Sequence, residues 1–307
     1  MFRKSNNHRY PATESPLPLP RILLIATVAL LALTFLIYPP VPQYNAFCAY
    51  DKLYSKNRIG SLNLQNIQWA PTRNYINDWH PLTTLSLMLD CEVSGCSSGF
   101  YWIDFYWVNI FFHLAGIFFL VLAGWRLTTQ AWSSLFVGAV FALHPTHIGS
   151  VACIDGRKDV LSGFFLAVLL WLYADYCKTG KHRLYWGALA AFVLGFLSSP
   201  ILLSVPILLF LLDYWPLGRM SVVSGEVKWP KFWRLVKEKL PFLLISGFFC
   251  AAVLISSHRA EPMNSFKSVP VARLSNVLLS YLNYVCRFLI PIQFPGDYRY
   301  PWNIPPL

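Results

Sequence analysis

Long apolar stretches separated by short polar segments dominate the chain and set the first expectation for its fold. A stretch of roughly 18 or more apolar residues is long enough to cross a bilayer as a helix. The pattern predicts seven such helices, some of them shorter than about 20 residues and therefore continuing into half-buried loops. The predicted helices cover residues 21–38, 102–122, 132–143, 160–176, 184–197, 201–215 and 242–256.

Residues 274–290 form an eighth apolar stretch whose placement stays open. The stretch is apolar enough to span, but it carries Asn276, Asn283 and Arg287. An amphipathic or re-entrant helix on the outer face fits it as well as an eighth crossing helix. The pattern predicts an all-α polytopic membrane protein with about seven transmembrane helices, or eight, together with outer-face loops and amphipathic helices.

Composition supports this class and excludes others. The chain is 56% hydrophobic and 17% aromatic but only 13% charged, about half the usual charged share. A water-soluble domain of 307 residues could not bury so much apolar surface, and disordered, collagen-like and nucleic-acid-binding classes are excluded. The expected environment is the lipid bilayer, with no nucleic-acid partner, and the net charge of +11 indicates topology instead.

The distribution of Lys and Arg predicts which side each loop faces. Residues 1–20 are basic, no small-residue cleavage site follows the first apolar stretch, and an uncleaved anchor with a cytoplasmic N-terminus is expected. Alternating the helices from there places 14 of the 25 basic residues on short cytoplasmic segments. The outer side receives the long loop 39–100, the turn 144–159 and the short turn 198–200. Residues 21–307 are predicted to form a single membrane domain.

Polar and ionisable side chains gather on the predicted outer side. Such groups are costly at membrane depth, so their clustering on one face indicates a site that opens outward. The candidate site residues are Asp51, Lys52, His80, His144, His147, Arg157, Lys158 and Asp159.

Most of these residues also have an ordinary structural interpretation. Asp51 could be a loop carboxylate. His144 and His147 have a spacing compatible with metal ligation, but Pro145 favours a turn and no third ligand is near, so no metal site is predicted.

The adjacent cations at the start of the fourth helix leave two alternatives open. Arg157 and Lys158 could anchor that helix at the interface, or they could bind a phosphate or pyrophosphate headgroup together with Asp159. Asn109 and His113 lie four residues apart on one helical face, where interhelical hydrogen bonding is the expected role.

Cysteine positions suggest one local crosslink. Cys91 and Cys96 lie on the predicted outer side and could form a disulfide in an oxidising compartment. The cysteines in or near membrane segments are expected only to pack: Cys153, Cys177, Cys250 and Cys286.

Several unusual strings resemble a known family. They occur in the same order in the membrane half of the transmembrane-and-tetratricopeptide-repeat O-mannosyltransferases and their bacterial relatives, within the C-type glycosyltransferase superfamily. The resemblance covers roughly residues 44–301. The strings are WHPLT at 79–83, LDC at 89–91, VN at 108–109 with His113, AVFALHPTH at 139–147, GRKDVLS at 156–162 and LDYWPLGR at 212–219.

The resemblance implies a glycosyltransferase of the C-type fold that uses a lipid-linked donor. Such enzymes take a sugar from a polyprenyl-phosphate carrier on the outer or lumenal face and attach it to a protein hydroxyl. By analogy, Asp51 is the expected base, and Arg157 and Lys158 are expected to hold the phosphate. No cofactor is required, although a divalent cation remains an alternative. The expected location is a bacterial inner membrane, or the endoplasmic reticulum in a eukaryote.

Three departures from the family pattern keep other functions open. Lys52 replaces the second of two adjacent acids, and Ser199 stands where a Lys commonly precedes proline. The chain also ends where relatives continue into further membrane helices and a repeat domain. An inactive or truncated relative that binds only the lipid carrier or a partner is the main alternative. A transporter is disfavoured, because the ionisable groups gather at one face and no internal repeat is visible.

Overall fold

The computed structural model describes residues 19–38, 67, 79–94, 102–220, 222–223, 226–227, 229–259 and 270–290. In these ranges the regular structure is helical apart from one antiparallel pair of two-residue strands, β1 (Val222–Val223) and β2 (Glu226–Val227). The predicted all-α class is therefore confirmed. The candidate residues Asp51 and Lys52 lie outside the described ranges.

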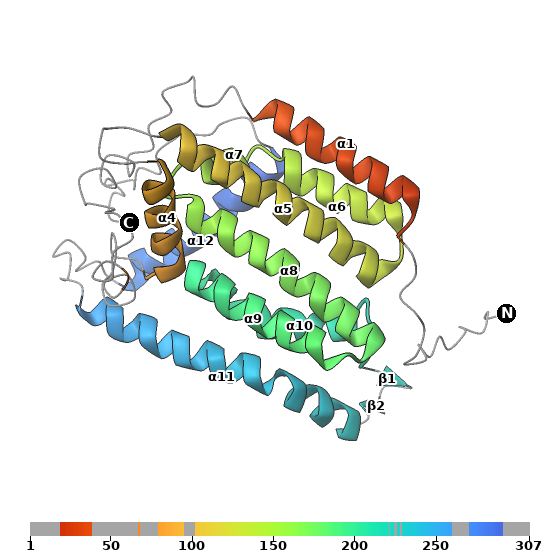
Figure 1. Cartoon of the computed structure of the whole chain (residues 1–307). Coiled ribbons are helices and arrows are strands. Elements are labelled where there is room, and N and C mark those ends of the chain that lie inside the picture. Colours follow the sequence, from red (N-terminus) through yellow and green to blue (C-terminus); the bar gives the residue numbers. More distant parts are fainter. Residues whose placement is uncertain are drawn as a thin grey trace.

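Every predicted apolar stretch corresponds to a helix (Figure 1). These are α1 (Arg21–Ile37), α5 (Trp102–Thr128), α6 (Ala131–Leu143), α8 (Arg157–Thr179), α9 (His182–Ser198), the 3-10 turn η3 (Pro200–Ser204) that continues into α10 (Val205–Tyr214), and α11 (Trp229–Arg259). Three more helices lie beside them, namely α4 (Pro81–Ser94), α7 (His147–Ala152) and α12 (Pro270–Leu289).

The two ends of the bundle carry different segments (Figure 1). One end, here the α7 end, holds α4, α7 and the first turn of α8; the other, here the hairpin end, holds β1 and β2. Segments 79–94, 144–159 and 198–200, which were predicted to share the outer side, lie at the α7 end. The connections 129–130 and 180–181 lie at the hairpin end, as expected for antiparallel neighbours.

Two glycines determine where α8 begins and ends. Gly156 precedes the helix, and a Cβ there would overlap the carbonyl oxygen of Ser150, so only glycine allows the chain to pass this close to α7. Gly180 ends the helix in the left-handed conformation with φ of 68°, and its N–H donates to the carbonyl of Tyr176.

The core lies among α8, α9 and α11, where aromatic side chains pack on one another. Tyr173, Phe192 and Phe242 are fully buried, and the rings of Phe192 and Phe242 are 5.4 Å apart. Outward-facing positions of the bundle are also apolar, since Trp132 is 75% exposed and Phe248 is 69% exposed. Large exposed apolar surface of this kind indicates contact with lipid or another apolar partner.

Two helical segments in the described part are long and apolar enough to cross a membrane, Phe105–Thr128 and Arg157–Thr179. The other apolar helices are shorter by this measure, including α1, α6 and the Pro200–Tyr214 segment. The positions of the helices were thus predicted correctly, whereas the count of seven membrane crossings stays a prediction.

Two features differ from the sequence-based expectation. The outer loop 39–100 contains a 14-residue helix, α4, which was not predicted. Cys153, which was expected only to pack, is disulfide-bonded, as is Cys91, whereas Cys177 near the hairpin end is free. Cys250 and Cys286 are also free, and which end of the bundle faces the outer or lumenal side stays a prediction.

Candidate functional site

The first three residues of α8 point in different directions. Successive residues of an α-helix project about 100° apart, so adjacent side chains cannot share one face. Arg157 is fully buried, Lys158 is partly exposed and Asp159 is exposed. The two cations that were predicted to bind phosphate together therefore lie in different environments.

The guanidinium of Arg157 is engaged by four groups inside the protein. Its Nη2 donates to the carboxylate of Asp90 at 2.6 Å and to the carbonyl of Phe105 at 2.9 Å. Its Nη1 donates to the hydroxyl of Ser86 at 2.8 Å, and its Nε donates to the side-chain oxygen of Asn109. This arrangement suits a residue that positions α4, α5 and α8 relative to one another, and direct contact of Arg157 with phosphate stays a prediction.

Asn109 extends this network to the end of α7 and the residue that follows it. Its amide nitrogen donates to the carbonyls of Val151, at 3.1 Å, and Cys153, at 3.0 Å. The interhelical role expected for Asn109 is thus observed. Sequence reasoning had left Asp90 and Asn109 out of the site, although a carboxylate in an apolar segment is itself a signal of a partner.

The other two α8 residues lie near the surface of the α7 end. The Nζ of Lys158 pairs with the carboxylate of Asp155 at 3.5 Å, and both side chains are partly exposed. The hydroxyl of Ser150 lies 3.4 Å from the carboxylate of Asp159. Lys158 is therefore a cation that solvent or a ligand can reach.

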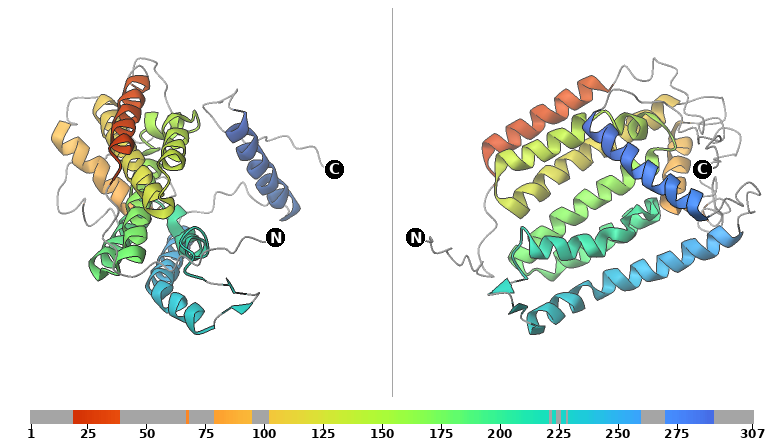
Figure 2. Two further views of the ribbon diagram at one scale, coloured as in Figure 1. Left: turned by 90° about the vertical axis from the view of Figure 1, so that its right-hand side faces the viewer. Right: turned by 180° about the vertical axis from the view of Figure 1, so that it is seen from behind.

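His80 immediately precedes α4 in the chain. The helix α4 lies on the opposite side of the bundle from α12 (Figure 2). The side chain of His80 is buried, and its Nδ1 lies 3.4 Å from the hydroxyl of Thr84. The hydroxyl of Thr83 donates to the carbonyl of Ser198 at 2.9 Å, which joins α4 to the turn at 198–200. Together with the bond between Arg157 and Asp90, this contact joins the three predicted outer segments.

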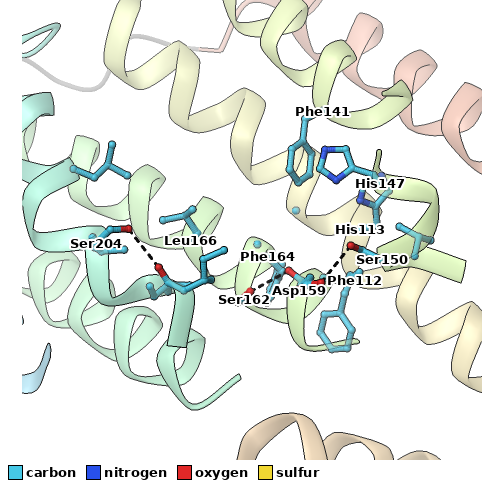
Figure 3. A pocket seen from close by; sticks show the side chains of 18 residues that line it. Phe112, His113, Phe141, His147, Ser150, Asp159, Ser162, Phe164, Leu166 and Ser204 are labelled. Carbon is cyan, nitrogen blue, oxygen red and sulfur yellow. Dashed lines mark hydrogen bonds between the residues drawn. The ribbon is translucent and has the colours of Figure 1, made fainter. Parts of the chain in front are cut away.

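A cavity of about 280 Å³ opens beside the first three turns of α8 (Figure 3). The side chains of His113, His147, Ser150 and Asp159 lie near one another in its lining, with Phe112 and Phe141 beside them. The cavity lies between α8 and the elements α5, α6, α7, η3 and α10. Its remaining lining residues are Phe112, Gly116, Phe141, Val151, Val160, Ser162, Gly163, Leu166, Ile201, Leu202, Ser204, Val205 and Leu208.

His144 connects the turn before α7 to α12. Its ring stacks on that of Phe288 with centroids 4.7 Å apart, and its Nε2 lies 2.9 Å from the carbonyl oxygen of Phe288. Its Nδ1 lies 2.8 Å from the hydroxyl of Thr146. His144 thus holds the C-terminal part of α12 against the turn before α7. His147, three residues later in the chain, lines the cavity.

The surroundings of His147 favour its neutral form. Burial, and then the nearby His144, lower the pKa of His147 below the ordinary histidine value of about 6.5. Among the described residues, no three His, Cys, Asp or Glu side chains are grouped as a metal site would require. The ring of His147 packs against those of Phe141 and His113, with centroids 4.5 Å and 5.8 Å away.

A second cluster of charges lies toward the hairpin end. Arg219 donates to Asp213 at 2.9 Å and to Glu238 at 2.6 Å, and Lys239 is paired with Asp213. Tyr173 donates to Asp213 at 2.9 Å. Two acidic and two basic side chains balance one another in this cluster. Its ion pairs connect α10 to α11. The string at 212–219 therefore has a structural role that sequence reasoning missed.

The two members of the predicted site that lie outside the described ranges are the candidate base and its neighbour. The expected proximity of Asp51 to Arg157 and Lys158, within about 15 Å so that a sugar and one phosphate fit between them, stays a prediction. The described part of the site comprises the Arg157 network, the surface residue Lys158 and the cavity.

Comparison with known proteins identifies similar chains. Protein O-mannosyl-transferase Tmtc2 of Drosophila melanogaster is 26% identical over 240 residues, which is 74% of this chain and 24% of that protein. Mouse protein O-mannosyl-transferase TMTC2 is 31% identical over 110 residues, or 36% of this chain and 13% of that protein. Human protein O-mannosyl-transferase TMTC4 is 30% identical over 113 residues, or 33% of this chain and 14% of that protein.

These similarities confirm the resemblance predicted from the motifs, and the chain matches at most about a quarter of the length of these three relatives. No protein-family model matches the chain. No solved structure matches it either.

Proposed function

We propose that this relative of the protein O-mannosyltransferases moves a mannose-like sugar from a polyprenyl-phosphate carrier to a protein hydroxyl. The observation that carries the proposal is the similarity to fly Tmtc2 across 74% of the chain. The partners are the lipid-linked donor, an acceptor protein and the bilayer. The protein crosses the membrane several times, with its N-terminus in the cytoplasm and the α7 end facing the lumen or the outside.

The geometry of the α7 end is compatible with an amphipathic donor. A polyprenyl-phosphate sugar has a polar head and an apolar chain, and the cavity is lined by both polar and apolar side chains. Lys158, which precedes the cavity-lining Asp159 in the chain, is partly exposed, and a cation there can stabilise the charge of a phosphate. Arg157 supports the arrangement from inside by fixing the start of α8.

The proposed reaction is a single inverting displacement. Asp51 takes the proton of the acceptor hydroxyl, the hydroxyl oxygen bonds to the anomeric carbon, and the carbon–oxygen bond to the phosphate breaks. The bond electrons leave with the phosphate, whose charge Lys158 and Lys52 stabilise. His80, His144, His147 and Asp159 belong to the surrounding binding surface. This step needs no metal, although a divalent cation could assist the phosphate's departure.

The test is transfer of radiolabelled mannose from polyprenyl-phosphate mannose to protein, with the full chain in liposomes and with and without EDTA. Asp51→Asn should abolish transfer, whereas Glu226→Gln at the hairpin end should leave it unchanged. Retention of full transfer by Asp51→Asn removes Asp51 from the mechanism. Loss of transfer in EDTA replaces the metal-free reaction with a cation-dependent one.

A second function is favoured by Lys52 and Ser199, which depart from the family pattern. An inactive relative would bind the carrier, or a partner protein, without transferring sugar. The same liposomes distinguish the two, because such a protein retains polyprenyl-phosphate mannose in a pull-down but releases no labelled acceptor. Absence of both binding and transfer contradicts both functions.

A further inference from the structure

His113 on α5 forms part of the wall of the cavity and has an unused ring nitrogen. The side chain is 4% exposed and packs against Phe141 and His147, with ring centroids 5.5 Å and 5.8 Å away. Its Nε2 is buried and has no hydrogen-bond partner among the described residues. A buried polar atom without a partner is costly, so a partner from a ligand or water is expected at this atom.

The bond made by the other ring nitrogen determines what Nε2 can bind. The ring of His113 hydrogen-bonds to the backbone of Ala142, in the last turn of α6, where carbonyl groups have no partner inside the helix. Nδ1 is then the donor in this bond. In a neutral imidazole the second nitrogen is an acceptor, so Nε2 accepts a hydrogen bond.

The charges of the described lining residues disfavour one class of partner. Among them there is no Lys or Arg, and Asp159 is acidic. A phosphate would face the carboxylate of Asp159 and the lone pair of His113 without a cation from the described lining. A neutral group rich in hydroxyls has the opposite character, because it donates hydrogen bonds to both acceptors and packs its carbon face on Phe141.

We propose that this cavity binds the sugar of the donor and that Nε2 of His113 accepts a hydrogen bond from one of its hydroxyls. The inference rests on the proposed use of a lipid-linked sugar and assigns the sugar to a different place from the phosphate. The sugar lies in the cavity, and the phosphate lies outside it toward Lys158. The volume of about 280 Å³ is near the lower limit of small-molecule pockets and suits a single sugar unit.

Two substitutions separate the ring nitrogens of His113. His113→Asn places an amide near Nδ1 and removes the group at Nε2, whereas His113→Gln places an amide near Nε2. Each variant is compared with wild type and with His182→Gln, an exposed histidine at the start of α9. Binding of polyprenyl-phosphate mannose and of polyprenyl phosphate is measured in phosphatidylcholine nanodiscs, after size-exclusion chromatography shows that each variant is folded.

The inference predicts that wild type prefers the mannosylated carrier and that His113→Asn lowers this preference roughly five- to tenfold, the effect of one hydrogen bond. His113→Gln should retain part of the preference, and binding of polyprenyl phosphate should not change in any variant. Equal binding of the two carriers by wild type, or an unchanged preference in His113→Asn, overturns the inference while leaving carrier binding intact. Failure of wild type to bind either carrier contradicts the proposed function itself.

Discussion

The guanidinium of Arg157 and the carboxylate of Asp90 lie 2.6 Å apart, although 67 residues separate them in the chain. The contact joins the first turn of α8 to α4, and both side chains are nearly excluded from solvent. Removing one member of a buried pair leaves the other charge without compensation. This pair is therefore a structural requirement of the α7 end and the basis for the first prediction.

Replacing Asp90 with Ala should destabilise the protein by roughly 3–5 kcal/mol, because Arg157 remains buried without its counter-charge. The measurement is the thermal unfolding midpoint in detergent. Lys158→Ala is the matched control, since the pair of Lys158 with Asp155 is partly exposed and its loss should cost below about 1 kcal/mol. Equal midpoints for Asp90→Ala and Lys158→Ala would contradict the assigned role of Arg157.

Gly156→Ala should destabilise the junction between α7 and α8, because the new Cβ overlaps the carbonyl oxygen of Ser150. Gly149→Ala in α7 is the control, because a Cβ there meets nothing within 4 Å. In a helix, this control change should be neutral or stabilising by about 0.5–1 kcal/mol. Unfolding midpoints that move in the same direction for both variants would show that the close approach at Gly156 is unimportant.

The hairpin-end cluster should make stability sensitive to Asp213 and to acid. Asp213→Ala leaves Lys239 buried and should cost roughly 3–5 kcal/mol. Burial alone would raise the pKa of Glu238, but hydrogen bonds from Arg219 and the nearby Lys239 lower it overall.

The acid dependence follows from the lowered pKa of Glu238. As the pH falls, the carboxyl of Glu238 binds a proton in the unfolded chain before it does so in the folded protein. The contribution of ionised Glu238 to the free energy of unfolding is therefore present above the ordinary Glu pKa and is lost as the pH falls below it. Glu238→Gln should therefore flatten the decrease of the unfolding midpoint below about pH 4.5. An unchanged acid dependence in Glu238→Gln would contradict this explanation.

Membrane sidedness can be tested with single introduced cysteines. Ser94→Cys on α4 and Lys181→Cys between α8 and α9 should react with a membrane-impermeant maleimide from opposite sides. The reason is that α4 lies at the α7 end, with the disulfide-bonded Cys91, whereas residues 180–181 lie at the other end. Each variant needs the parent chain as a background control, because Cys177, Cys250 and the exposed Cys286 are free. Labelling of both from one side would overturn the topology and the outward-facing site.

The helices were predictable from the sequence because each is a continuous apolar run. Residues 160–176 identified α8 to within three residues at each end, since lipid-facing and buried positions are both apolar. The helix α4 was missed for the opposite reason. Its sequence mixes threonines, serines and acids with leucines, and it is stabilised by contacts with residues far along the chain, such as Arg157.

The sequence predicted which types of residue form the site, but not the directions in which their side chains point. The string at 156–159 marked the start of α8 correctly, yet the sequence could not show that Arg157 faces α4 while Asp159 faces the cavity. That distinction depends on which helix packs on which side, and it came from Asp90 and Asn109, which sequence reasoning had not assigned to the site. The importance of His113 depends in the same way on its unpartnered Nε2.

The last prediction concerns pH and His147. Burial and the nearby His144 lower the pKa of His147, so the folded protein resists protonation there. The unfolded chain takes up a proton near pH 6.5, and stability should therefore be complete above that pH and decrease as the pH falls below it. Two other titratable groups face His147: His113 packs against it, and Asp159 lines the same cavity. A charged His113 would lower the pKa of His147 and a charged Asp159 would raise it, and the test changes neither residue.

His147→Gln should reduce this decrease, as measured by unfolding midpoints between about pH 5 and pH 8. His182→Gln is the matched control, because His182 is exposed at the start of α9 and should leave the slope as it is in the parent chain. The quantity compared is the slope of the unfolding midpoint against pH and not the midpoint itself, since either substitution could shift stability at every pH. A slope in His147→Gln equal to that of His182→Gln would mean that another group, and not His147, makes the α7 end sensitive to mild acid.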